Sequence, residues 1–244
     1  MKLAVYNIRY ATGTGLSYHL PVPFTGYFRP SRQNLDKIIT FLKRENPDII
    51  GLVEVDEGSY RTQKRNQAEY IAQQLDCSHV YESKYAETSI VRRLPVLRRQ
   101  GNAFITNQNI VARQFHFFRH GMKRLVIELE FDTFSVFLVH LSLKYRHRQY
   151  QLGDLHALFQ RVEKPIIVAG DFNAFWGDHE LALFMAASGL KNANTEGVPT
   201  FPSIAPKRQL DFILHSPEIK VTGFRVPRVR HSDHLPMICE FTPP

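Results

Sequence analysis

The sequence predicts an α/β protein in which two packed β-sheets carry helices on their outer faces. Short apolar runs typical of strands alternate with amphipathic segments typical of helices along the chain. In the middle of the chain, strand-like runs follow one another with only short turns between them, which favours antiparallel pairing there. No low-complexity linker interrupts the pattern, so we expect one domain over residues 1–244.

The N-terminal part of the chain alternates between strands and helices. A strand is predicted over residues 2–8, "KLAVYNI", and another over residues 47–55, "PDIIGLVEV". Residues 31–46 between them are predicted as a helix, because their apolar residues recur at helical spacing and Ser31 is a suitable N-cap. A second amphipathic helix is predicted over residues 66–75.

The rest of the chain adds the antiparallel run and two further helices. The run consists of strands predicted over residues 101–107, 124–131 and 134–143. Helices are predicted over residues 148–162 and 179–189. The remaining apolar runs predict strands over residues 165–173, 210–216, 220–226 and 236–241.

Composition excludes several classes of protein. The chain has 31 Lys and Arg against 23 Asp and Glu, and its formal net charge of +8 favours polyanionic partners such as nucleic acid or anionic lipid. With only Cys77 and Cys239 there is neither a disulfide framework nor a thiolate zinc site, and a reducing compartment is expected. No stretch approaches a membrane span, and Asn7 and Arg9 interrupt what would be a signal peptide. We expect a soluble, cytoplasmic monomer.

Polar side chains gather at or near the ends of the predicted apolar strands. They are Asn7, Glu54, His140, Asp171, Asn173, Asp211, Asp233 and His234. If these strand ends converge, they form a cluster of carboxylates, amides and imidazoles without thiolates. Hard oxygen ligands suit Mg²⁺ or Mn²⁺, and histidines beside them can transfer protons or neutralise developing charge on a phosphate. The cluster therefore indicates metal-assisted hydrolysis of a phosphoester.

Six short motifs carry a resemblance to a known family. In chain order they are "YNIRY", "GLVEVD", "VHLSL", "GDFNAF", "LDFIL" and "SDHLP", spread from Asn7 to Pro236. Together they resemble the successive motifs of the endonuclease/exonuclease/phosphatase superfamily, which includes deoxyribonuclease I-like nucleases, apurinic endonucleases, deadenylases, inositol polyphosphate phosphatases and neutral sphingomyelinases. Each motif alone is weak, but six in this order over nearly the whole chain are a strong signal. The resemblance implies a deoxyribonuclease I-like, four-layer α/β/β/α sandwich of two mainly antiparallel sheets, in agreement with the strand and helix pattern.

The resemblance also implies a cofactor and a role for each polar residue. Mg²⁺ or Mn²⁺ would be held mainly by Glu54, with Asn7 and Asp233 around the metal and its water. Asp171 would orient or deprotonate the attacking water, and Asn173 would hold a phosphate oxygen.

The histidines complete this implied site. Asp211 would hydrogen-bond His234 and fix its tautomer, and His140 would contact the scissile phosphate from the opposite side. His234 and Asp171 are both candidates for acid–base work. The implied function is a metal-dependent phosphoesterase that cleaves phosphodiester bonds by assisted attack of water.

The substrate is less well specified than the reaction. Nucleic acid is favoured by the net charge and by basic clusters at residues 144–148 and 225–231, which must lie near the site if the motif assignment is right. A third basic cluster, residues 91–100, either contacts the substrate or forms a solvated loop remote from it. Apurinic endonucleases usually have a Tyr-containing segment in place of "VHLSL", so apurinic repair is disfavoured. A phospholipid or an inositol phosphate is the alternative substrate.

Each of these residues has a structural alternative. Asp171 is also suited to an Asx turn, and Asp56 is expected to be a solvated carboxylate in a turn. Phe175 and Trp176 either pack beneath their loop or contact a base or a lipid. A serine hydrolase is disfavoured because the chain has no G-x-S-x-G motif. The stronger rival function is a non-catalytic module that binds nucleic acid or anionic lipid on the same fold.

Overall fold

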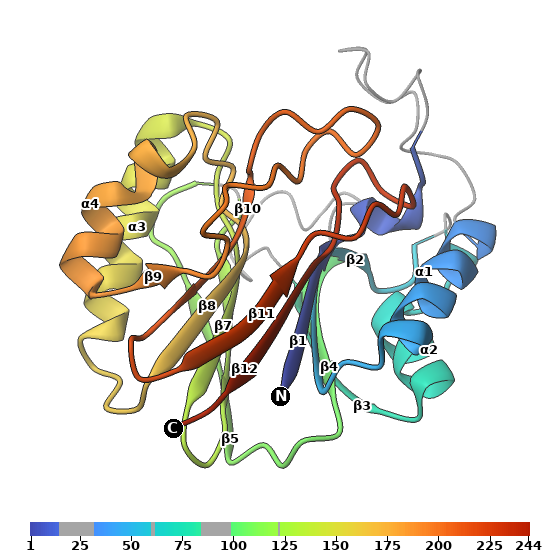
Figure 1. Ribbon diagram of the computed structural model, residues 1–244. Helices are drawn as coiled ribbons and strands as arrows, with labels where there is room; N and C mark the ends of the chain where they lie inside the picture. Colours follow the sequence, from blue (N-terminus) through green and yellow to red (C-terminus); the bar gives the residue numbers. More distant parts are fainter. Residues whose placement is uncertain (15–31, 60–61, 84–98, 122) are drawn as a thin grey trace.

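The computed structural model describes residues 1–14, 32–59, 62–83, 99–121 and 123–244. Within these residues, two six-stranded sheets pack face to face and helices cover their outer faces (Figure 1), which confirms the expected α/β/β/α sandwich. The predicted cap Ser31 and most of the basic cluster 91–100 lie outside the described residues. No described helix is long and apolar enough to cross a lipid bilayer.

The first sheet has the strand order β11–β12–β1–β2–β4–β3. Its strands are β1 (Lys2–Asn7), β2 (Ile49–Asp56), β3 (Ser78–Ser83), β4 (Gln100–Thr106), β11 (Lys220–Arg225) and β12 (Met237–Thr242). β1 and β2 are parallel, and the other neighbours are antiparallel. A short 3-10 turn, η1 (Arg9–Ala11), follows β1, and helices α1 (Arg32–Glu45) and α2 (Gln67–Leu75) cover the outer face.

The second sheet has the strand order β5–β6–β7–β8–β10–β9. Its strands are β5 (Ala112–Phe117), β6 (Leu125–Glu130), β7 (Ser135–His140), β8 (Ile166–Asp171), β9 (Lys191–Asn192) and β10 (Asp211–His215). β7 and β8 are parallel and are joined by helix α3 (Tyr145–Phe159), while the other pairs are antiparallel. Helix α4 (Asp178–Ser188) lies beside α3 on the outer face.

The strands separate three apolar layers, one between the sheets and one beneath each pair of helices. In β1, Leu3 and Val5 face the layer between the sheets, whereas Ala4 and Tyr6 face α1 and α2. Successive side chains of a strand point to opposite faces, so a strand buried on both faces has an unbroken apolar sequence. This is why the central strands were predictable from apolar runs.

The structure differs from the prediction mainly at the sheet edges. β3, β5 and the very short β9 were not predicted, because edge strands expose one side and their sequences are mostly polar. β4 pairs with β2 and β3 rather than with the central antiparallel run, so the chain crosses from one sheet to the other between β4 and β5.

A buried ion pair joins α3 to α4. Arg148 belongs to the basic cluster 144–148, yet its side chain is 1% exposed and pairs with the equally buried side chain of Glu180. Its Nη1 also donates to the carbonyl oxygens of Ser142 and Leu143, at 2.8 and 2.9 Å. Arg148 is therefore an interior residue that fixes the turn after β7, and its charge is not available to bind a substrate at the site, contrary to what its place in the basic cluster suggested.

Replacing Arg148 with Met should lower the free energy of unfolding by about 3–5 kcal/mol, because Glu180 is left as a buried, unpaired carboxylate. The measurement is urea unfolding followed by circular dichroism. Arg119 pairs with Asp154 but its side chain is 81% exposed, so Arg119→Met is the matched control and should change stability by less than about 1 kcal/mol. Equal effects of the two substitutions would show that the buried pair contributes no more than the exposed one.

Candidate active site

The register of the second sheet brings three of the predicted site residues together. His140 at the end of β7 is the direct partner of Asp171 at the end of β8, and Asp171 is the partner of Asp211 at the start of β10. All three side chains share the face of Leu138, Ala169 and Ile213, which is the face turned toward the first sheet. The expected convergence of strand ends is therefore present at this end of the second sheet.

Asn7 reaches the same place from the first sheet. It is the last residue of β1 and shares the inward face of Leu3 and Val5. Its Nδ2 donates to Asp171 Oδ2 at 3.1 Å, and its Oδ1 accepts the backbone N–H of Arg9 at 3.1 Å. The contact between Asn7 and Asp171 joins the two sheets at the site.

Glu54 does not end its strand, as the sequence suggested, but lies within β2 at a bulge. The pairing with β4 shifts between Leu52 and Val55, and Glu54 has a φ of +58°. Val53 faces the layer between the sheets and Val55 faces the helices, so Glu54 is the extra residue that resets the alternation. The Oδ1 of Asn102 in β4 accepts the Glu54 N–H at 3.3 Å. The bulge directs the Glu54 carboxylate toward His140, whose Nε2 lies 3.8 Å from Oε1.

The Asp171 carboxylate is the hub of the cluster. Its Oδ2 lies 3.3 Å from His140 Nε2 and 4.0 Å from His234 Nε2, in addition to the bond from Asn7. Its Oδ1 accepts the backbone N–H of Asn173 at 2.9 Å. Burial alone would raise the pKa of Asp171, but His234 and the hydrogen bond from His140 hold that pKa well below its usual range. Asp171 is therefore ionised although its residue surface is only 1% exposed.

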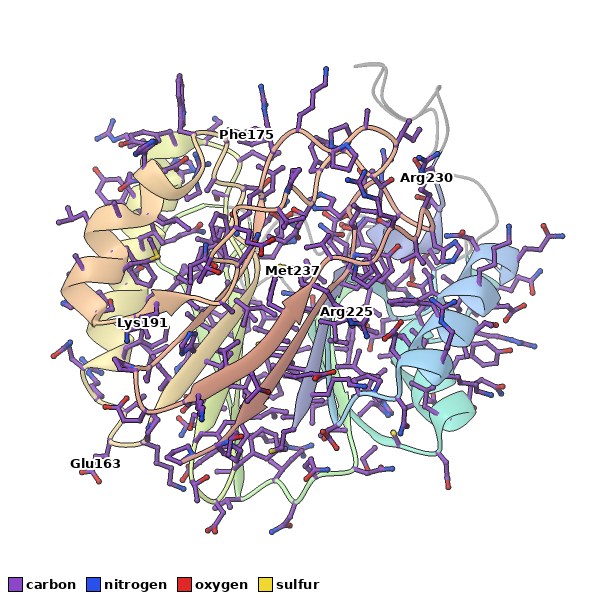
Figure 2. The ribbon with its side chains drawn as sticks, in the orientation of Figure 1. Glu163, Phe175, Lys191, Arg225, Arg230 and Met237 are labelled. Atoms are coloured by element: carbon purple, nitrogen blue, oxygen red, sulfur yellow. The ribbon has the colours of Figure 1, made fainter. Side chains whose placement is uncertain are left out.

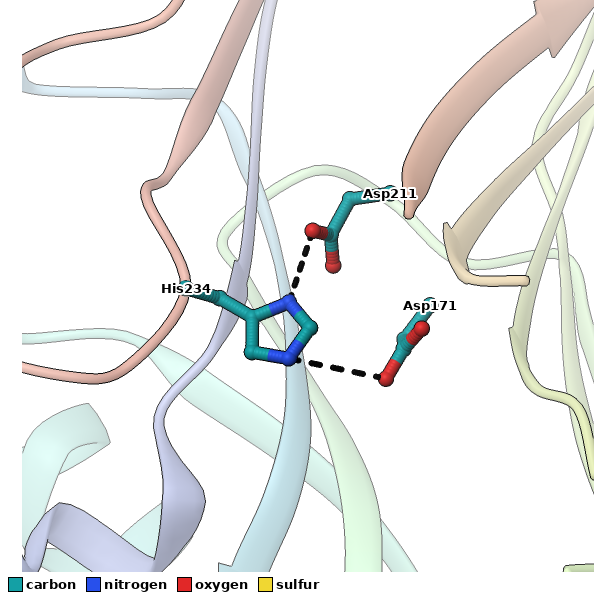
Figure 3. A group of neighbouring side chains, drawn as sticks. All are labelled: Asp171, Asp211 and His234. Carbon is teal, nitrogen blue, oxygen red and sulfur yellow. Dashed lines mark hydrogen bonds and ion pairs between the residues drawn. The ribbon is translucent and has the colours of Figure 1, made fainter. Parts of the chain in front are cut away.

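His234 lies between two carboxylates (Figure 3). Its Nδ1 donates to Asp211 Oδ2 at 2.8 Å, and the Thr200 hydroxyl donates to the same oxygen at 2.6 Å. Burial would lower the pKa of His234, but the charges of Asp211 and then Asp171 raise that pKa to about 10. Burial raises the pKa of Asp211. Asp211 and Thr200 thus fix the imidazole with Nε2 toward Asp171.

Asn173 and Asp233 are held by their own local contacts. Asn173 has a φ of +51°, and its Nδ2 donates to the Leu141 carbonyl oxygen at 2.9 Å. Asp233 Oδ2 lies 3.3 Å from Arg9 Nη1, and its Oδ1 accepts the Ser232 hydroxyl at 3.2 Å. Since Arg9 also donates its backbone N–H to Asn7, it links two of the predicted metal ligands.

Lys123 is a site residue that the sequence reasoning missed. Its ammonium contacts His140 Nε2 and lies 3.8 Å from Glu54 Oε1. Gln151 of α3 holds the segment, because its Nε2 donates to the Lys123 carbonyl oxygen at 2.7 Å and its Oε1 accepts the Ser142 N–H at 2.8 Å. Burial, and after it the Lys123 charge, lower the pKa of His140 to about 4. Lys123 lies outside all six motifs, so the sequence offered no signal for it.

Asp56 is not the solvated turn carboxylate that the sequence suggested. The residue is fully buried, and its Oδ1 accepts the backbone N–H groups of Gly58 and Ser59 at 2.9 and 2.6 Å. Its Oδ2 accepts the Ser59 hydroxyl at 2.6 Å. Asp56 therefore organises the turn that follows β2.

Two groups of side chains, with no residue in common, offer ligands of the kind that divalent metals use. One nitrogen or oxygen atom from each of Asp171, Asp211 and His234 lies within 4.8 Å of the others. In this group the Asp211 Oδ2 atom already accepts hydrogen bonds from His234 Nδ1 and from the Thr200 hydroxyl. The predicted ligands Glu54, Asn7 and Asp233 offer only oxygen donors, which is the type of donor that Mg²⁺ and Mn²⁺ prefer.

Comparisons with solved structures agree with this architecture. Over 100% of this chain and 71% of the other, the fold is similar to the endonuclease/exonuclease/phosphatase from Beutenbergia cavernae DSM 12333, with a TM-score of 0.74 and 16% identity. It is also similar to the mannosyl-6-phosphatase of Bacteroides thetaiotaomicron VPI-5482, with 99% of both chains covered, a TM-score of 0.71 and 15% identity. The catalytic domain of human Nocturnin gives a TM-score of 0.69 and 20% identity over 100% of this chain and 94% of the other.

No curated protein matches this chain in sequence. The sequence model of one family matches residues 4–234, which include all eight predicted site residues from Asn7 to His234. This match shows that the chain belongs to the Endonuclease/Exonuclease/phosphatase family, in agreement with the sandwich and with the cluster at the strand ends.

Proposed function

We propose that this protein is a Mg²⁺- or Mn²⁺-dependent phosphoesterase that hydrolyses phosphodiester bonds, with nucleic acid as the favoured substrate. Members of its family are phosphoesterases, which sets hydrolysis of phosphate esters as the general class of reaction. The observation that carries the proposal is the buried Asp171 carboxylate, whose Oδ2 faces Asn7, His140 and His234 at once. Two of these three partners are imidazoles that can transfer protons, whereas the buried Asp56 carboxylate, which organises a turn, accepts from two backbone N–H groups and a serine hydroxyl.

Asp171 and His234 are the proposed acid–base pair. Asp171, which its surrounding donors keep ionised, would orient the attacking water and accept its proton as the new oxygen–phosphorus bond forms. His234 would hold or move a proton at Nε2, because Nδ1 is fixed on Asp211 at 2.8 Å. The Phe201 ring, 4.9 Å from the imidazole, restricts its orientation further.

The remaining residues of the cluster would bind the phosphate and the metal. Asn173 and His140 would donate to phosphate oxygens, and the ammonium of Lys123 would add positive charge beside His140. Glu54, with Asn7 and Asp233, would hold the metal. When bound, Mg²⁺ or Mn²⁺ supplies charge neutralisation at the phosphate and activation of water.

Phospholipid or inositol phosphate remains the alternative substrate. A binding module without catalysis is less well supported, because binding alone does not require a buried Asp–His–Asp arrangement with a threonine behind it. We further propose that residues 1–244 form one domain, because the layer between the sheets draws side chains from both. Cys77 and Cys239 are free thiols, which supports a reducing, cytoplasmic location.

Asp171→Asn and His234→Asn should each lower kcat by about 10²–10⁴-fold, because proton transfer to or from the reacting groups is lost. The measurement is hydrolysis of bis-p-nitrophenyl phosphate, with circular dichroism to show that each variant is folded. His179→Asn, a substitution of an exposed histidine on α4, is the matched control and should leave kcat unchanged. Wild-type rates in both site variants would refute the assignment.

Removal of divalent cations by EDTA should abolish turnover, and addition of Mg²⁺ or Mn²⁺ should restore it. Glu54→Gln should raise the Mg²⁺ concentration needed for half-maximal rate, because one carboxylate ligand becomes a neutral amide. The rates are measured on single- and double-stranded DNA, RNA, sphingomyelin, an inositol polyphosphate and bis-p-nitrophenyl phosphate. Turnover that persists in EDTA would contradict the metal requirement.

Lys123→Met should lower kcat/KM by about 10–100-fold on any phosphodiester, because a hydrogen bond to a charged group contributes about 1.5–3 kcal/mol. Lys164→Met is the control, since Lys164 pairs with Glu130 at 2.7 Å, at the end of the sheet away from the site. If both lysine variants lose activity equally, the effect comes from net charge and not from a contact in the site.

A further inference from the structure

Exposed aromatic and basic side chains lie beside the strands that carry the candidate site. The segment after β7 contains Tyr145, the segment after β8 contains Phe175 and Trp176, and the segment before β10 contains Arg208. β7, β8 and β10 are neighbours in the second sheet, and His140, Asp171 and Asp211 are in register. The three segments are therefore connected to the same end of these strands. Figure 2 shows Phe175 at this end of the molecule and Glu163 at the opposite end.

Trp176 is strongly exposed, so the alternative that it packs beneath its loop is wrong. Its residue surface is 73% exposed and that of Tyr145 is 57% exposed. Tryptophan is usually well buried, and exposed aromatic surface beside a catalytic cluster is typical of a contact with substrate. Phe175 is half-buried, and the Arg208 guanidinium lies 5.6 Å from the centre of its ring.

The loop that carries Trp176 is anchored on both sides. Phe172 and Ala174 are fully buried in the layer beneath α3 and α4. The N–H of Gly177 donates to the Ala174 carbonyl oxygen at 2.9 Å, and the φ of Gly177 is +68°, which a glycine adopts without strain. This tight turn fixes the backbone on both sides of Trp176 while the indole remains outside.

Arg208 connects this surface to the catalytic cluster. The backbone of Arg208 pairs with that of Phe201 through a β-bridge, and the Phe201 ring lies 4.9 Å from the His234 ring. A chain of substrate that contacts Arg208 and Phe175 therefore lies within reach of the cluster around Asp171 and His234.

We propose that Tyr145, Phe175, Trp176 and Arg208, here called the aromatic platform, bind the bases of single-stranded nucleic acid next to the scissile phosphate. This inference rests on the proposed phosphoesterase function and specifies its substrate. Rings lie beside cations on the platform: the Arg208 guanidinium lies over the Phe175 ring, and the exposed Lys144 directly precedes Tyr145 in the sequence. A polymer in which bases alternate with phosphates complements this pattern, and the position of the platform beside the candidate site favours it over a lipid interface, where Trp, Lys and Arg also gather.

Trp176 is the only tryptophan in the chain, so its fluorescence reports on the platform alone. Titration of the whole protein in EDTA with a single-stranded oligonucleotide should quench this fluorescence in a saturable manner, with an affinity that falls as salt rises. Arg208→Ala should weaken binding without shifting the unfolding transition. Absence of quenching at saturation, measured by an independent binding signal from a labelled oligonucleotide, would overturn the proposal.

Kinetics separate the platform from the reaction itself. Trp176→Ala should lower kcat/KM on a single-stranded oligonucleotide by about 5- to 150-fold, chiefly through KM, and should lower it far less on bis-p-nitrophenyl phosphate, because that substrate offers single nitrophenyl rings and no run of successive bases. Trp176→Phe should restore most of the loss. Leu183→Ala is the matched control, since Leu183 on α4 is 81% exposed and lies outside the platform.

The possible failures are distinguishable. If bis-p-nitrophenyl phosphate is not hydrolysed but the oligonucleotide quenches Trp176, the proposed function fails and the platform stands. If bis-p-nitrophenyl phosphate is hydrolysed and Trp176→Ala changes nothing on oligonucleotides, the platform is overturned. A fluorescence blue shift on vesicles of anionic phospholipid, without quenching by the oligonucleotide, would overturn it in favour of membrane docking.

Discussion

The structure around the candidate site depends on the solvation of one buried negative charge. An ionised carboxylate away from water is unfavourable by several kcal/mol unless donors surround it. Asp171 is surrounded by the side chains of Asn7, His140 and His234 and by the backbone N–H of Asn173. These partners come from both sheets and from the loop before β12, so the sandwich must bring its two sheets together for this charge to be stable. The same requirement explains why Thr200 and Asp211 are buried behind His234.

Much of the fold follows from apolar pattern, and the exceptions have physical causes. Strands buried on both faces, such as β1 and β8, have unbroken apolar sequences and were predicted close to their observed bounds. β3 and β5 are edge strands whose side chains are together mostly polar and at least partly exposed, so hydrophobicity does not identify them as strands. The bulge at Glu54 is a backbone feature held by Asn102 from another strand, and single-sequence periodicity does not register such a contact.

The site was predictable only as far as its motifs extend. The strand-end residues were identified because they interrupt apolar runs, and the parallel register of β7 with β8 then places His140 opposite Asp171. Lys123 and Thr200 reach the cluster from segments without a motif, and their roles depend on tertiary contacts through Gln151 and Asp211. Arg148 shows the reverse error: with its basic neighbours it was expected to add positive charge near the site, while a buried carboxylate on α4 draws it into the interior.

Division of the cluster between the two sheets has a consequence for how the protein acquires activity as it folds. Asn7 and Glu54 belong to the first sheet, and His140, Asp171 and Asp211 belong to the second. A partly folded chain with only one sheet formed would contain half of the cluster. Chains of this size commonly fold through such intermediates, in which secondary structure precedes final packing. Recovery of activity during refolding therefore marks the docking of the sheets, which is a later event than the recovery of helix and strand content.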